Sequence, residues 1–494
     1  MSDQRALQGT YIAVMRARVI VAGVALFVAC KGSEREVPQP PAKLAGVRVV
    51  DLIPVSLSGE TWQDAEPFLA LYASNPKLLA ASAFTPNPGG STSGTAPIFV
   101  SDDGGDSWTL RNTLPSQSMT ADITHAVGGN PPVLYAGIMK VPDFPLNELK
   151  ASDVFSPATM TLQGFRADID QPFVRTTAVG NADRVYVGLN DFDAPNGRTA
   201  TVDVSLDGGT TYTSRRIETR NTLGQNGPSI RPAVAQDHTV YVAYFGWRSN
   251  AGSDVTSDVV VARDDSGATG ATSFRDLVDP ADNLPGRFVA THVTIPWSNA
   301  PTLGQERIGS TLAIAVDALH SDNVYLAWAD RVGTGDIYTV HVRRSTDRGA
   351  TWTGDLRTLT NATDASLAVS TNGTVGLLYQ QVIGSAGTSR WVTRLEQSRD
   401  GFATHRDVVL ATVPATTPAF QFLPYIGDYN CLLTRGSQFL GIFSANNTPD
   451  SANFPQGVVY QRRVDFPTHR LLDGSGAPVA VSIDPFFFSV PILP

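Results

Sequence analysis

The chain has 494 residues, a formal net charge of -9 and only 17% charged residues, with 43 glycines and 33 prolines. This acidic balance argues against a nucleic-acid partner. The glycine and proline usage, with no sustained apolar pattern of helical period beyond the N-terminus, predicts an all-β chain. Length alone suggests about three domains, but a closed ring of repeats can absorb the whole span as one domain.

The N-terminal segment has the features of an export signal. Arg16 and Arg18 precede the apolar run VIVAGVALFVA, which is followed by Cys30. A basic start, an apolar stretch too short for an ordinary membrane span and a small residue before the cysteine resemble a bacterial lipoprotein signal peptide. The resemblance implies that residues 1–29 are removed and that Cys30 is lipidated, with translation starting at Met15. A simple anchor or secretory signal with an incidental Cys30 is the alternative.

Residues 30–46 are rich in proline and charge and predict a tether that holds the domain off a bacterial membrane, at the cell surface or in the periplasm. If Cys30 is lipidated, Cys431 is the only other cysteine, so no intramolecular disulfide can form. The folded domain is expected over residues 47–494.

Seven units of related pattern follow, each with a polar start, an apolar strand, a turn and an aromatic-rich strand. They begin at Glu66, Asp122, Asp170, Ser229, Ser310, Asp364 and Tyr425. Most lie roughly fifty to sixty residues apart, the size of a four-stranded blade with its loops. The units predict a single β-propeller, with seven blades favoured and six as the alternative. The segment 47–57 can supply the strand that closes the ring with the last unit.

A turn motif follows three of these units, as SDDGGDSW, SLDGGTTY and STDRGATW. Its shared residues are Ser101, Asp103, Gly105 and Trp108, then Ser205, Asp207, Gly209 and Tyr212, then Ser345, Asp347, Gly349 and Trp352. Weaker copies hold Asp265, Gly267 and Thr269, and Ser398, Asp400 and Thr404. Ser and Asp side chains bond backbone amides within a turn, Gly supplies positive φ, and the aromatic ring packs beside the hairpin.

The motif resembles the Asp box, S-x-D-x-G-x-[ST]-[WYF], of sialidases and other BNR-repeat β-propellers. The resemblance implies that each box is a structural hairpin on the face opposite the active site. The rim of that other face would then be built from the loops that enter first strands and leave second strands. Those positions are polar: Glu66, Asp122, Asp170, Arg231, Arg307, Asp364 and Asp428 enter first strands, and Asp191, Arg248, Asp330 and Arg331 leave second strands.

Carboxylates and arginines on one rim suit a glycan-processing site, because carboxylates act as acid and base and arginines bind an anionic substituent. Each of these residues can also cap a strand or pair with a neighbour. Tyr429, in GDYNCLL, resembles the tyrosine nucleophile of sialidases. The resemblance implies catalytic roles for Tyr429, Asp170, Asp122 and Glu66, and substrate-binding roles for Arg231, Arg248, Arg307, Arg331 and Arg394. The arginine of the family motif F/Y-R-I-P is missing, because the first unit has AEPF at 65–68.

Two function classes follow. The first is a surface-anchored exo-glycosidase resembling exo-α-sialidase, and the second is a non-catalytic propeller that binds glycan or protein at the bacterial surface. A hydrolase or lyase acting on uronate-bearing polysaccharide is a third. Three arginines converging beside Tyr429 would favour the first class. We expect a monomer that contacts a membrane through its lipid anchor and needs no cofactor; the histidines lack the spacing of a metal site, and a structural calcium ion stays open.

Overall fold

The computed structural model describes residues 43–84, 95–115, 120–140, 145–154, 160–194, 199–220, 226–251, 254–296, 311–332, 338–385 and 387–493. Within these ranges all regular structure is β, apart from one short 3-10 helix, η1 (Val55–Leu57). Among the described helices, none has the length and apolar character to cross a membrane. The predicted signal peptide, Met15, Cys30 and Arg307 lie outside the described residues.

Seven four-stranded antiparallel sheets follow one another along the chain, one for each sequence unit. We number them as blades 1 to 7. Blade 1 contains β2 (Ala65–Leu71), β3 (Leu79–Phe84), β4 (Thr95–Ser101) and β5 (Thr109–Pro115); blade 2 contains β6 (Thr120–Gly128), β7 (Val133–Lys140), β8 (Leu146–Ala151) and β9 (Thr161–Arg166); blade 3 contains β10 (Ile169–Val179), β11 (Ala182–Asp191), β12 (Ala200–Ser205) and β13 (Thr213–Arg216).

Blade 4 contains β14 (Arg231–Val234), β15 (Val240–Ala251), β16 (Asp254–Asp264) and β17 (Arg287–Pro296); blade 5 contains β18 (Leu312–Val316), β19 (Val324–Arg331), β20 (Tyr338–Ser345) and β21 (Arg357–Thr360); blade 6 contains β22 (Ala362–Val369), β23 (Val375–Ile383), β24 (Arg390–Ser398) and β25 (Arg406–Pro414). Blade 7 contains β26 (Cys431–Arg435), β27 (Gln438–Asn446), β31 (Ile483–Pro491) and β1 (Arg48–Asp51).

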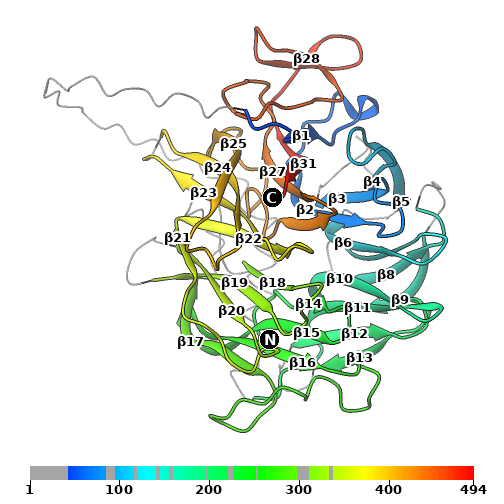
Figure 1. Ribbon diagram of the computed structural model, residues 1–494. Helices are drawn as coiled ribbons and strands as arrows, with labels where there is room; N and C mark the ends of the chain where they lie inside the picture. Colours follow the sequence, from blue (N-terminus) through cyan, green and yellow to red (C-terminus); the bar gives the residue numbers. More distant parts are fainter. Residues whose placement is uncertain are drawn as a thin grey trace, which may run out of the picture.

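The blades form a closed β-propeller (Figure 1). The first strand of each blade contacts the first strand of the next, and β26 contacts β2 to complete the ring. In blade 7 the N-terminal strand β1 is outermost and pairs with β31 near the C-terminus, with Val50 opposite Phe487. The ring is therefore closed by strands from the two ends of the described chain. A small sheet of β28 (Arg463–Asp465), β29 (Arg470–Leu472) and β30 (Pro478–Val479) is inserted between β27 and β31.

Four of the first strands carry an irregularity near their start. The register shifts between Ala65 and Phe68, between Thr120 and Ile123, between Asp170 and Phe173, and between Thr363 and Ser366. Glu66, Gln171 and Asp364 within these bulges have φ values of 53, 46 and 53°, in the left-handed region that non-glycine residues rarely occupy. A bulge re-aims a side chain, and such strain is often found at functional sites.

The box hairpins lie at the opposite end of the sheets from these bulges. Ser101 is in register with Leu79, which pairs with Leu71 at the end of β2 far from Glu66. In blade 3, Ser205 is likewise in register with Val185, which pairs with Thr176. The bulges and the box hairpins therefore mark two opposite faces of the propeller.

Each full box is a closed set of hydrogen bonds. In the first, Ser101 Oγ accepts from the Gly105 amide at 2.8 Å and donates to Asp103 Oδ1 at 2.8 Å. Asp103 in turn accepts from the Ser107 hydroxyl at 2.6 Å. The same bonds recur in the copies that begin at Ser205 and Ser345. These side chains therefore hold the turns of their hairpins in one conformation, which we call the staple role.

The two weaker copies are also built as turns. At Ser398 the serine hydroxyl accepts from the Phe402 amide at 2.8 Å, and Phe402 adopts φ 65° where the full boxes have glycine. In the other copy Asp264, one residue before the expected Asp265, takes the place of the box serine. Its carboxylate accepts a hydrogen bond from the Ala268 amide at 2.8 Å.

Candidate active site on the propeller axis

Seven polar residues meet where the first strands begin. We call them the axial cluster: Glu66, Asp122, Gln171, Arg231, Asp364, Asp428 and Tyr429. All seven side chains are buried, and Arg231 is 1% exposed. Each comes from the first strand of a blade or from the segment just before it, and four of them, Glu66, Asp122, Gln171 and Asp364, sit on the bulges described above. The fold therefore places on the axis the type of residue that cores normally exclude unless it is paired.

Tyr429 and two carboxyl groups form one side of the cluster. The Tyr429 hydroxyl donates to Asp122 Oδ1 at 3.2 Å, and the Asp122 carboxyl is hydrogen-bonded to Glu66. Burial raises the pKa of Asp122, and burial together with the charges of Asp122 and Glu66 raises the pKa of Tyr429 well above its usual value. Two adjacent buried carboxyl groups favour sharing one proton between them. Asp122 can accept the phenolic proton of Tyr429 only when its own carboxyl group is ionised.

Arg231 forms the other side. Its Nη2 donates to Gln171 Oε1 at 2.8 Å and to Ser229 Oγ at 3.4 Å, while Nε and Nη1 are buried without a hydrogen-bond partner. The guanidinium lies over the rings of Phe173 and Tyr429, at 4.5 and 5.4 Å from their centroids. Burial lowers the pKa of Arg231 to about 10, so it stays charged at neutral pH.

Within the described ranges Arg231 makes no salt bridge to a carboxylate, although the charges of Asp122 and Asp428 act on it; Arg166, Arg220, Arg357 and Arg462, by contrast, are directly paired. Unsatisfied buried donors on a charged group cost free energy that an anionic ligand would recover. Arg231 therefore has the chemistry of a carboxylate-binding residue.

Two more carboxyl groups complete the cluster. Asp428 Oδ2 accepts from Gln171 Nε2 at 2.8 Å. Asp364 Oδ2 is buried without a hydrogen-bond partner, and burial together with the nearby Asp428 charge raises the pKa of Asp364 well above its usual value. A carboxyl group held in its protonated form can donate a proton at neutral pH.

The structure separates the other predicted arginines from this cluster. Arg248 pairs with Asp258 of its own blade, Arg331 with Asp254 of blade 4, and Arg394 with Asp407 of its own blade. Of the predicted substrate-binding arginines in the described ranges, Arg231 alone belongs to the axial cluster. Within those ranges the three-arginine arrangement is not assembled.

Sequence reasoning missed Gln171. It named Asp170, one residue earlier, which is half-buried, whereas it is Gln171 that bonds Asp428 and Arg231. The signal that could have found it is a short repeat: EPF at 66–68 and QPF at 171–173 share a polar residue before Pro-Phe, and Arg231 also precedes a proline.

Two cavities lie away from the cluster. One, of about 410 Å³, lies between blades 4 and 5 and is lined by Phe288, Val289, Ala290, Thr291, Val293, Trp328, Asp330, His341 and Arg343. His341 stands between Asp355 at 2.9 Å and Asp330 at 3.1 Å; although burial opposes it, these hydrogen bonds raise the pKa of His341. Trp328 stacks on His341 and is only 1% exposed, so its ring is part of the wall. The other cavity, of about 280 Å³, includes His125 and Arg175.

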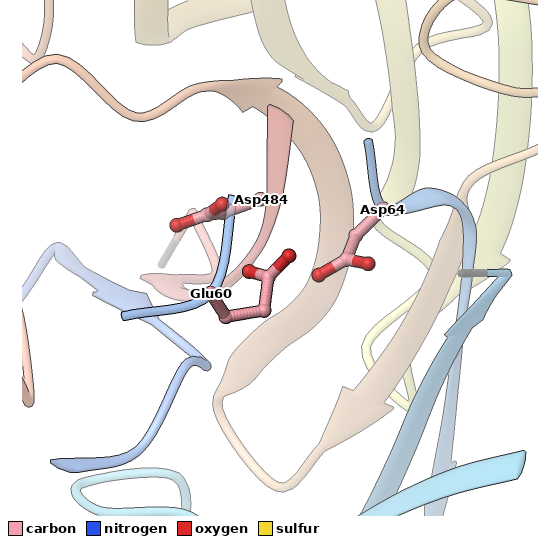
Figure 2. A group of neighbouring side chains, drawn as sticks. All are labelled: Glu60, Asp64 and Asp484. Carbon is pink, nitrogen blue, oxygen red and sulfur yellow. The ribbon is translucent and has the colours of Figure 1, made fainter. Parts of the chain in front are cut away.

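Among the described residues, one group of carboxylates is close enough to share a metal ion: Glu60, Asp64 and Asp484 (Figure 2). It lies where the two ends of the ring join, and its Asp64 is two residues before Glu66 of the axial cluster.

No family model and no curated protein sequence matches the chain. Among solved structures, the chain is similar to the GH74 enzyme of Niastella koreensis, with 15% identity and a TM-score of 0.39 over 79% of this chain and 64% of that one. It is similar to a PL25 ulvan lyase, with 10% identity and a TM-score of 0.49 over 80% of this chain and 93% of that one.

It is also similar to a mutant of NanB sialidase from Streptococcus pneumoniae, with 10% identity and a TM-score of 0.35 over 83% of this chain and 68% of that one. The chain thus spans slightly less than two thirds of the GH74 enzyme. These likenesses are too distant to carry an argument about function, which has to come from the axial cluster itself.

Proposed function

We propose that the protein is a glycoside hydrolase that removes a terminal acidic sugar at the axial cluster. One observation carries the proposal: the Tyr429 hydroxyl donates to a buried carboxylate, while Arg231 beside it keeps two buried N–H groups unsatisfied. The first feature suits a phenol that loses its proton as it attacks, and the second suits a sugar carboxylate.

Tyr429 is the nucleophile in this mechanism. Its oxygen attacks the anomeric carbon, its proton passes to Asp122, and the bond to the leaving oxygen breaks. A neutral phenol suits an anionic sugar, because a carboxylate nucleophile would be repelled by the sugar's own carboxylate. Water then cleaves the aryl glycoside and restores Tyr429.

Asp364 is the general acid in this mechanism. Its raised pKa keeps it protonated, and its buried Oδ2 has no hydrogen-bond partner. It gives its proton to the departing oxygen in the first step and takes one from water in the second. Burial is the main cause of the raised pKa of Asp364, and the charge of the neighbouring Asp428 adds to it.

The second candidate function is a propeller that binds an acidic glycan without cleaving it. The observation that favours it is that Arg231 alone, among the four predicted substrate-binding arginines in the described ranges, has no aspartate paired with it: Arg248, Arg331 and Arg394 each pair with an aspartate elsewhere. Recognition by Arg231 alone would still select an anionic sugar, without requiring that Tyr429 react.

The experiment is the release of fluorophore from 4-methylumbelliferyl glycosides by the purified protein. The panel contains a sialoside, a glucuronide and neutral glycosides, and Tyr429→Phe is assayed beside wild type. Turnover of an acidic glycoside that falls at least about 10³-fold in Tyr429→Phe is the expected result.

The matched control is Tyr186→Phe, because Tyr186 is also a buried strand tyrosine whose hydroxyl donates a hydrogen bond, to the Gly267 carbonyl at 3.0 Å, away from the cluster. Its activity should equal that of wild type. Binding of an acidic glycan by folded protein, with no turnover of any glycoside, would replace the hydrolase proposal with the binding one.

A further inference from the structure

The carboxylates of Glu60, Asp64 and Asp484 come from the two segments that close the ring. Glu60 lies between η1 and β2, Asp64 immediately precedes β2, and Asp484 is the second residue of β31. The two segments run side by side, since the Asp64 amide donates to the Ile483 carbonyl at 2.8 Å and the Leu52 amide to the Pro485 carbonyl at 3.0 Å. Any ion held by all three carboxylates would therefore join the first blade to the last.

The geometry of the three groups suits one ion. One carboxylate oxygen from each residue lies within 4.8 Å of the others, and Figure 2 shows the Glu60 carboxylate turned into the space between Asp484 and Asp64. Two oxygens that bind one Ca²⁺ at about 2.3 to 2.6 Å are separated by at most roughly 5 Å. The carboxylates are thus already at ligand spacing.

One buried guanidinium, that of Arg462, is shared by several carboxyl groups beside this group. Arg462 has no exposed side-chain surface and pairs with Asp484 and, at 3.5 Å, with Asp51. The charge of Arg462 also acts on Glu60, so this guanidinium is shared among the carboxyl groups of Asp51, Asp484 and Glu60. Buried charges that exceed their partners are costly unless they are neutralised.

Glu60 supplies a second, separate indication. Its Oε1 accepts from the Trp62 amide, but Oε2 is buried and accepts no hydrogen bond. A buried carboxylate oxygen that accepts no hydrogen bond is costly, and a cation would offset that cost. By contrast, Asp484 Oδ1 already accepts from the Ser482 hydroxyl at 2.8 Å, which orients it.

We propose that Glu60, Asp64 and Asp484 bind a divalent cation, Ca²⁺ in preference to a transition metal. This ion would stabilise the seam of the propeller, the place where blade 1 joins blade 7. The donor set is entirely carboxylate oxygen, which hard cations prefer, and it contains no histidine or cysteine. None of the three carboxylates belongs to the axial cluster, so calcium binding is measured without reference to the activity proposed there.

The test is calcium binding by the purified full-length chain after treatment with EDTA and dialysis. Isothermal titration with Ca²⁺ should show about one ion per chain, and 1 mM Ca²⁺ should raise the melting temperature by about 2 to 4 °C. Mg²⁺ and Zn²⁺ are titrated in parallel, and Ca²⁺ should bind more tightly than either.

The diagnostic variant is Glu60→Gln, which keeps an oxygen acceptor for the Trp62 amide and removes the charge. It should bind Ca²⁺ at least tenfold more weakly and lose the calcium-dependent rise in melting temperature. Asp64→Asn is the second variant in case the first does not fold. Asp102→Asn, an exposed carboxylate elsewhere, should bind like wild type.

Either of two results would overturn the proposal. One is the absence of Ca²⁺ binding at 1 mM in folded wild-type protein, with a melting temperature that EDTA leaves unchanged. The other is calcium binding that Glu60→Gln and Asp64→Asn both retain at full strength, which would place the ion elsewhere.

Discussion

Polar side chains on the two faces of the propeller differ in how completely their hydrogen bonds are satisfied. At the box hairpins the serine and aspartate side chains are satisfied within their own turns, as in Ser101 and Asp103. At the axial cluster the side chains are buried, yet Arg231 and Asp364 retain atoms without a hydrogen-bond partner. Satisfied exposed turns stabilise a fold, whereas buried unsatisfied groups are costly to the fold and are therefore candidates for binding and chemistry.

This contrast separates stability from activity. Substitutions in the boxes should lower stability without changing the activity of the folded molecules. Substitutions in the axial cluster should lower the activity without lowering the stability. Some of them should even stabilise the protein, because a buried charge is removed.

The largest effect is expected at the general acid. Asp364→Asn should lower the hydrolysis of a glycan by about 10²- to 10⁴-fold, because the departing alcohol then receives no proton. Aryl glycosides with acidic phenols leave without that proton and should be cleaved at a rate much closer to wild type. Equal losses on both substrate types would show that Asp364 is not the acid. The melting temperature should be unchanged or higher.

Trp108→Ala should give the largest loss of stability, about 3 to 5 kcal/mol in urea unfolding. Trp108 is 3% exposed and packs on Phe487, so its removal leaves a cavity between blades 1 and 7. Trp352 is only half-buried, and Trp352→Ala should cost about 1 to 3 kcal/mol. Activity per folded molecule should be that of wild type in both; a specific loss of activity would place the boxes in the functional site.

A smaller loss is expected when a box serine is removed. Ser345→Ala leaves the buried Gly349 amide without its acceptor at 2.8 Å and removes the bond to Asp347 at 2.7 Å. The cost should be about 1 to 3 kcal/mol, measured as a lower urea midpoint with an unchanged m-value. Ser345→Thr, which keeps the hydroxyl, should recover most of it, and a failure to do so would contradict the staple role.

The smallest effect concerns pH and the cavity between blades 4 and 5. The pKa of His341 is raised in the folded state. The stability that its charged form contributes is therefore fully present below pH 6.5, the ordinary histidine pKa, and is lost as the pH rises through the pKa of the folded state. His341→Gln should therefore be less stable than wild type at pH 6, by about 1 kcal/mol, and the difference should shrink in alkaline buffer. Glycosidase activity should be unaffected, whereas a large loss would move the active site to this cavity.

The sequence was sufficient for the architecture because the fold is repetitive. The repeated units predict the all-β ring of four-stranded sheets, and segment 47–57 supplies β1 in the last sheet as expected. The arrangement on the axis was only partly predictable. Glu66, Asp122, Arg231, Asp364 and Asp428 were named from their positions at the start of first strands, and Tyr429 from the resemblance of its segment to the sialidase nucleophile. The structure brings them together.

What the sequence could not supply was the exact direction of side chains and their distant partners. A bulge shifts which residue faces the axis, so the polar residue at the entrance of the strand, Asp170, was named rather than Gln171. Arg331 was expected on the rim, but its partner Asp254 belongs to the neighbouring blade. The same limit applies at the seam, where Glu60 and Asp484 come from opposite ends of the chain.

The most direct test of the axial site is to trap the covalent intermediate. A fluorinated acidic glycoside with a good leaving group reacts with the nucleophile quickly and is released slowly, so the adduct can be located by mass spectrometry of proteolytic peptides. We expect one adduct per chain, on the peptide that contains Tyr429, and none in Tyr429→Phe. An adduct on another residue, or one that persists in Tyr429→Phe, would contradict the assignment of Tyr429 as the nucleophile.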